Sequence, residues 1–88
     1  MCRNIRRLHN FEPPATSEEI QAASTQFIRK VSGFTKPSKA NEAAFQHAVE
    51  QVSNIVDTLL NSLVTNAPPL DRELEAQKRK ARAAKRFT

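Results

Sequence analysis

The chain has 88 residues with a net charge of +5, a single glycine and a single cysteine. This length allows one domain with a thin core, and the hydrophobic content of 39% is too high for a disordered chain. The lone cysteine excludes a disulfide within the chain, the basic N-terminus is unlike a signal peptide, and no apolar run is long enough to span a membrane. We therefore expect a cytoplasmic protein.

No segment alternates apolar and polar residues as a strand does, so we expect an all-α fold. The prediction is one domain over residues 1–88, built as a small three-helix bundle around a long central helix. An N-terminal arm covers residues 1–15 and lies across the central helix. The helices cover residues 17–32, 39–65 and 70–86, and the last is basic and partly mobile at its end.

The first helix has a clear start and stop. Thr16 and Glu19 fit a capping box, in which each side chain bonds the backbone amide of the other residue. Gly33 can adopt the left-handed conformation that ends a helix. Apolar residues at steps of three and four predict a buried face comprising Ile20, Ala23, Phe27 and Val31.

The second helix is the longest element, and we expect Ser38, after Pro37, to cap its start. Its apolar stripe contains Phe45, Val49, Val52, Val56, Leu59 and Leu63, widened by Ala48, Ile55 and Leu60. At 1.5 Å per residue it would be about 40 Å long, against about 24 Å for the first helix. The uncovered length predicts contact with the third helix, the arm or a second copy, which favours a homodimer.

The third helix follows a second proline pair. Pro68 and Pro69, then Leu70 and a capping Asp71, repeat the order of Pro13 to Thr16. Acidic residues come first and basic residues later, as the helix dipole favours. The basic residues predicted to contact nucleic acid or an acidic protein are Lys78, Arg79, Lys80, Arg82, Lys85 and Arg86. The alternative is a solvated tail; membrane binding is not expected, because the apolar face is small.

Several strings together carry a family resemblance. They are MCRNI at residues 1–5, NFEPPAT at 10–16, SGF at 32–34, KPSKAN at 36–41, APP at 67–69 and DR at 71–72. The chain resembles a family of small, mainly bacterial proteins known only as a domain of unknown function. The resemblance implies a small helical protein and assigns no reaction, cofactor or partner to any residue.

Cys2 admits three interpretations. If Met1 is removed, the thiol and the new α-amine form a nucleophile with its own base. Alternatively, thiolate, amine and His9 bind a soft metal, although three ligands are fewer than the four that a stable site uses. The third interpretation is a small apolar side chain packed against a helix.

The arginines of the arm, Arg3, Arg6 and Arg7, form a candidate anion site, because guanidinium groups bind phosphate or carboxylate through paired donors. Alternatively, Arg3 or Arg6 caps the carbonyls at the C-terminal end of a helix while the others stay solvated. The spacing of Ile5, Leu8 and Phe11 by three predicts an arm that packs on the bundle.

Catalytic motifs are not evident. His9 and His47 lack a nearby carboxylate partner in the sequence, and the chain has no Gly-rich phosphate loop or paired-cysteine motif. We predict no cofactor and no metal. The predicted function is a non-catalytic binding module that uses its basic surface for an acidic partner such as nucleic acid. The alternatives are a thiol- or metal-dependent protein centred on Cys2 and a homo-oligomeric structural component.

Overall fold

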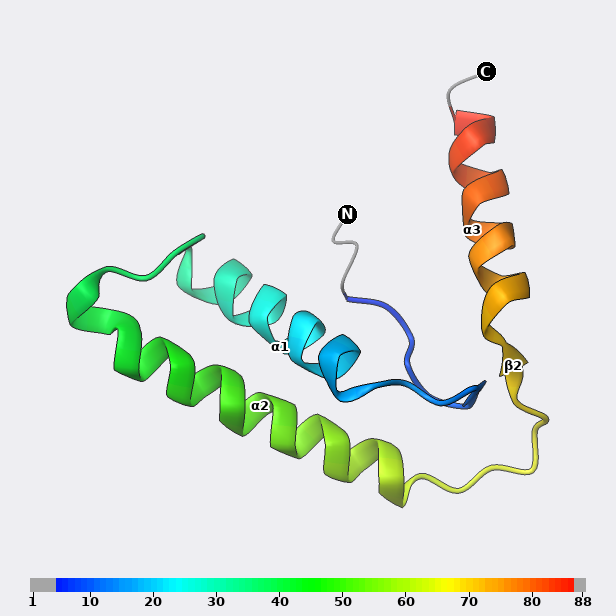
Figure 1. The fold of residues 1–88 in the computed structure, drawn as a ribbon, viewed down its shortest axis with the longest axis horizontal. Coiled ribbons are helices and arrows are strands. Elements are labelled where there is room, and N and C mark those ends of the chain that lie inside the picture. Colours follow the sequence, from blue (N-terminus) through cyan, green and yellow to red (C-terminus); the bar gives the residue numbers. More distant parts are fainter. Residues whose placement is uncertain (1–4, 87–88) are drawn as a thin grey trace.

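The computed structural model describes residues 5–86 and is mostly helical. Its elements in chain order are β1 (Phe11–Glu12), α1 (Ser17–Ser32), the 3-10 turn η1 (Lys39–Asn41), α2 (Glu42–Ser62), β2 (Leu70–Asp71) and α3 (Arg72–Arg86). Figure 1 shows α1 and α2 side by side as an antiparallel hairpin, with α3 standing apart from them.

The predicted limits of the first helix are confirmed by its caps. The Thr16 hydroxyl accepts the Glu19 amide at 3.2 Å, and the Glu19 carboxylate accepts the Thr16 amide at 2.9 Å. At the other end Gly33 has a φ of 78°, and its amide donates to the Arg29 carbonyl at 2.9 Å. The two ends of α1 are therefore specified locally.

The second helix is shorter than predicted. It begins with η1, and the prediction that Ser38 caps it is wrong, because the Ser38 hydroxyl accepts the Asn41 side-chain amide at 2.8 Å instead of a helix backbone amide. α2 ends at Ser62, where the backbone of Leu63 turns extended. The chain then runs without regular structure to β2.

The core lies between α1 and α2 and is small. Among the described residues the fully buried apolar side chains are Ile20, which is 5% exposed, and Val49, which is 2% exposed. Ser24 is buried beside them, and its hydroxyl is satisfied by the Ile20 carbonyl at 2.8 Å. Two helices bury too little surface to form a deep core.

A short parallel ladder, absent from the sequence prediction, joins the arm to the start of α3. Phe11 pairs with Leu70 and Glu12 with Asp71. The two proline pairs flank this ladder, and the Glu12–Pro13 peptide is cis.

Asn10 fastens the arm to the second proline pair. Its φ is 64°, a left-handed conformation that asparagine tolerates better than most residues. Its side-chain amide donates to the carbonyls of Ala67 at 3.3 Å and Pro68 at 3.2 Å, while its own carbonyl accepts the Leu70 amide at 2.8 Å. Because Pro68 and Pro69 have no N–H to donate to a ladder, the carbonyl groups of this segment and the Leu70 amide supply its hydrogen bonds to Asn10.

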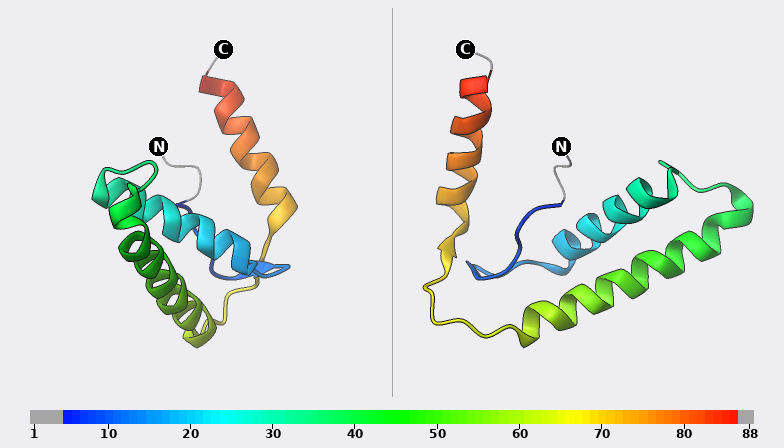
Figure 2. Two further views of the ribbon diagram at one scale, coloured as in Figure 1. Left: turned by 60° about the vertical axis from the view of Figure 1, so that its left-hand side comes forward. Right: turned by 180° about the vertical axis from the view of Figure 1, so that it is seen from behind.

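The predicted three-helix bundle is not formed in the part of the chain that the structure describes. The segments around the β1–β2 ladder, where the arm meets the start of α3, form a junction. Figures 1 and 2 show that α3 extends away from this junction and does not lie along α1 or α2. The described part of the arm, residues 5–15, also differs from the prediction, since it runs between the start of α1 and the base of α3 and not across α2. No helix within residues 5–86 is long and apolar enough to cross a membrane.

Asn10→Ala tests whether the clamp, meaning the hydrogen bonds of Asn10 to Ala67, Pro68 and Leu70, stabilises the fold. We expect it to lower the free energy of unfolding by about 2 kcal/mol, since it removes hydrogen bonds and since alanine tolerates a left-handed backbone less well than asparagine. Asn10→Gly should cost about 1 kcal/mol, since it keeps the backbone conformation accessible. Urea unfolding measures both. Asn61→Ala, on the exposed surface of α2, is the control; if all three variants unfold alike, the clamp is not stabilising.

Candidate functional site

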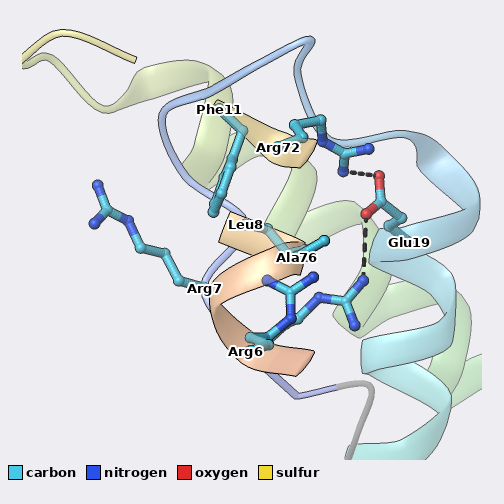
Figure 3. Close-up of a pocket in the computed structure, with 8 residues that line it drawn as sticks. Arg6, Arg7, Leu8, Phe11, Glu19, Arg72 and Ala76 are labelled. Carbon is cyan, nitrogen blue, oxygen red and sulfur yellow. Dashed lines mark hydrogen bonds and ion pairs between the residues drawn. The ribbon is translucent and has the colours of Figure 1, made fainter. Parts of the chain in front are cut away.

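A pocket of about 150 Å³ lies where the arm, α1 and α3 meet. Four arginines line it, Arg6 and Arg7 from the arm and Arg72 and Arg79 from α3, together with one carboxylate, Glu19 of α1. The remaining lining is apolar and comprises Leu8, Phe11 and Ala76. Figure 3 shows Glu19 facing both Arg6 and Arg72.

Glu19 is the centre of the polar contacts in this pocket. Its Oε1 accepts hydrogen bonds from the Thr16 amide and from Nη2 of Arg72, so one atom serves the cap of α1 and holds the start of α3. The hydrogen bond from Arg72 is the main cause that lowers the pKa of Glu19 below its ordinary value of 4.5. Partial burial opposes this effect, because it disfavours the charged carboxylate.

The arginines of the arm are held differently. Arg6 lies beside the first turn of α1, with its Nη2 3.6 Å from Oε2 of Glu19. This carboxylate is therefore a side chain of the same protein and not that of a bound ligand. Arg7 points away from Glu19 in Figure 3; its Nε donates to the His9 carbonyl at 3.1 Å, and its guanidinium lies 6.0 Å from the centre of the Phe11 ring. Of the predicted anion site, Arg3 lies outside the described residues.

The basic residues predicted on the third helix separate into two groups. All five described ones, Lys78, Arg79, Lys80, Arg82 and Lys85, are exposed along α3, and of these Arg79 also lines the pocket. Lys78 also forms an ion pair with Glu75 at 3.4 Å. The side chain of Arg86 lies outside the described part.

The thiol and metal interpretation concerns Cys2, which lies outside the described residues. His9 is partly buried and His47 is exposed. Residues 5–86 contain no group of three or more histidine, cysteine or acidic side chains placed to hold a metal ion.

The fold and the pocket define a small, mostly helical protein with an arginine-rich junction between its helices. Residues 1–78 match the family described as uncharacterized conserved protein (DUF2277), and the chain belongs to that family. The resemblance seen in the sequence is therefore confirmed. Comparisons with curated proteins and with solved structures found no match.

Sequence reasoning identified Arg6 and Arg7 but missed Glu19, Arg72 and Arg79 as their neighbours. Glu19 was assigned to the capping box, which uses the carboxylate only locally. The two similar proline segments were the available signal, because a parallel pairing between them brings Arg72 to the start of α1. Spacing along the chain does not reveal that pairing.

Glu19→Gln tests the electrostatic part of this junction. Glutamine also suits the capping box, so the variant removes the charge and keeps the cap. The pKa of Glu19 is lower in the folded chain than its ordinary value of 4.5. The stabilisation by its charge is therefore present above pH 4.5 and is lost as the pH falls through the pKa of the folded chain. Urea unfolding at a series of pH values should show the variant less stable near neutrality, by about 1 kcal/mol. This difference should shrink in acid.

The matched control is Glu18→Gln, which removes the same charge from the exposed neighbouring position. We expect a smaller difference that reflects only the helix dipole. If both variants lose equal stability at every pH, the contact between Glu19 and Arg72 does not stabilise the fold.

Proposed function

We propose that the protein is a non-catalytic binding module that uses the basic surface of α3 to contact an acidic partner, with nucleic acid as the first partner to test. The observation that carries this proposal is the isolation of α3. Residues 77–85 are all exposed and stand apart from the α1 and α2 hairpin. They include five cations and no acidic residue.

The arrangement of these cations supports contact with phosphates. Lys78, Arg82 and Lys85 recur at steps of four and three, so they share one edge of the helix. Several charges on one edge can neutralise neighbouring phosphates and release counterions. Gln77 is the one amide side chain of the segment, so we expect contacts to phosphates to dominate and binding to depend little on base sequence.

Replacing Lys78, Arg82 and Lys85 together by glutamine tests this function. We expect binding to random single- or double-stranded nucleic acid to weaken. The slope of log affinity against log salt concentration is negative, and its magnitude should decrease by about 2 to 3, because each lost phosphate contact removes roughly 0.7 to 0.9. Fluorescence anisotropy at a series of salt concentrations measures both quantities.

The matched control replaces Arg29, Lys30 and Lys36 by glutamine, which removes the same charge from the end of α1 and the loop after it. It should leave the slope near that of the unchanged chain. Equal losses in the two triple variants would mean that net charge drives the binding, and binding without salt dependence would contradict the proposal.

A second candidate function, a homo-oligomeric structural component, is favoured by an exposed apolar stripe on α2. Ile55 and Leu59 lie four residues apart on α2 and Leu63 follows the last residue of the helix; their exposed fractions are 67%, 52% and 44%. Such residues on one face of a helix usually cover a core or a partner. A second copy of this chain is the partner proposed for this stripe.

The size of the exposed surface agrees with a dimer. The chain exposes 7021 Å², whereas a compact protein of its mass exposes about 5200 Å². Its radius of gyration is 15.5 Å, against about 12 Å for a compact chain of this length. The excess exceeds the roughly 800 Å² that each partner buries in a standard interface.

Leu59→Lys tests the dimer. We expect the unchanged chain to have twice the monomer mass by light scattering at micromolar concentration. The variant should dissociate at least about tenfold more readily, because it buries a charge in the apolar interface. Asn54→Lys, on another face of α2, should remain dimeric. A monomeric mass for the unchanged chain at every concentration would rule out this candidate.

A further inference from the structure

We propose that the pocket at the base of α3 binds a compact dianionic phosphate group, either free or at the end of a small organic molecule. This inference does not depend on nucleic-acid binding by α3. It rests on the charge, size and lining of the pocket formed by the arm, α1 and α3.

The charge of the pocket is unbalanced. Four guanidinium groups line it, and Glu19 is the one carboxylate among its lining residues. Arg79 makes no hydrogen bond or ion pair with another residue in the described part of the chain. A group with two negative charges therefore neutralises cations that Glu19 alone does not.

The size of the pocket selects the ligand class. A volume of about 150 Å³ is below the roughly 300 Å³ at which pockets for drug-sized ligands begin. The pocket can therefore enclose a phosphate group and a few further atoms, but not a whole nucleotide. Paired N–H groups of arginine match the oxygen spacing of a phosphate.

The apolar lining strengthens this binding. Leu8, Phe11 and Ala76 contribute carbon surface beside the guanidinium groups. This surface covers part of the pocket, while Arg6, Arg7 and Arg79 remain exposed to solvent. The same surface can pack against the organic part of a phosphate monoester.

Glu19 is a built-in competitor for this ligand. Its Oε1 is engaged by Thr16 and Arg72, whereas its Oε2 faces Arg6 at 3.6 Å, longer than a hydrogen bond. A phosphate oxygen can bind Arg79 while Oε1 of Glu19 keeps its contacts. The negative charge of Glu19 then opposes the ligand, and removal of that charge should tighten binding.

The experiment is a titration of the full chain with inorganic phosphate, and separately with phenyl phosphate, followed by NMR. The ionic strength is held constant with chloride. We expect saturable shifts confined to residues of the arm, the first turn of α1 and the base of α3. Phenyl phosphate binding more tightly than inorganic phosphate indicates an organic phosphate as the ligand; equal affinities indicate free phosphate.

Three variants decide the proposal. Glu19→Gln, which keeps the capping box, should bind phosphate about threefold to fivefold more tightly. Arg79→Gln should bind at least about threefold more weakly. Arg82→Gln makes the same replacement outside the pocket lining and should bind like the unchanged chain, because salt screens distant charges.

Two results would overturn the proposal. One is a set of unsaturable shifts spread along α3 and equally reduced by Arg79→Gln and Arg82→Gln, which means diffuse ion association. The other is phosphate affinity that is unchanged or weaker in Glu19→Gln while its α1 amide shifts remain native-like.

Discussion

The arrangement of this protein depends on one carboxylate oxygen, Oε1 of Glu19. It accepts the Thr16 amide, which fixes where α1 begins, and it accepts Arg72, the first residue of α3. The helix cap joins residues three positions apart, whereas the second contact requires residues 53 positions apart to meet. A local capping motif thus serves as the anchor for the last helix of the chain.

The proline pairs explain why this anchor needs support. Each pair stiffens the chain before a helix and removes backbone donors, so a longer ladder between the two segments cannot form. Asn10 adds further contacts at this point, since its backbone is left-handed and its side-chain amide donates to the carbonyls of Ala67 and Pro68. The junction is therefore a set of specific polar contacts with limited apolar burial, which explains how a pocket persists there.

Sequence patterns predicted the parts of the structure that are determined locally. The Thr16 and Glu19 cap, the stop at Gly33 and the capping role of Asp71, whose carboxylate accepts the Leu74 amide, follow from side chains within a few residues of each other. The packing of α3 was mispredicted, because a stripe as weak as Leu70, Leu74, Ala81 and Ala84 does not specify a partner surface. The pocket was missed for a related reason: its cations are distant in sequence, and the ladder that unites them has only two residue pairs.

The contacts that hold α3 in place are weak, so the proposed anion at its base would affect its position. An ion pair as exposed as that of Arg72 with Glu19 contributes only about 1 kcal/mol, and the ladder adds few hydrogen bonds. The proposed anion, bound between the arm and Arg79, would add its binding free energy to these weak contacts. Occupancy of the pocket and order of α3 would then be coupled reciprocally, because each would favour the same arrangement of the arm and α3. A basic helix held by so few contacts is thereby suited to respond to a small ligand.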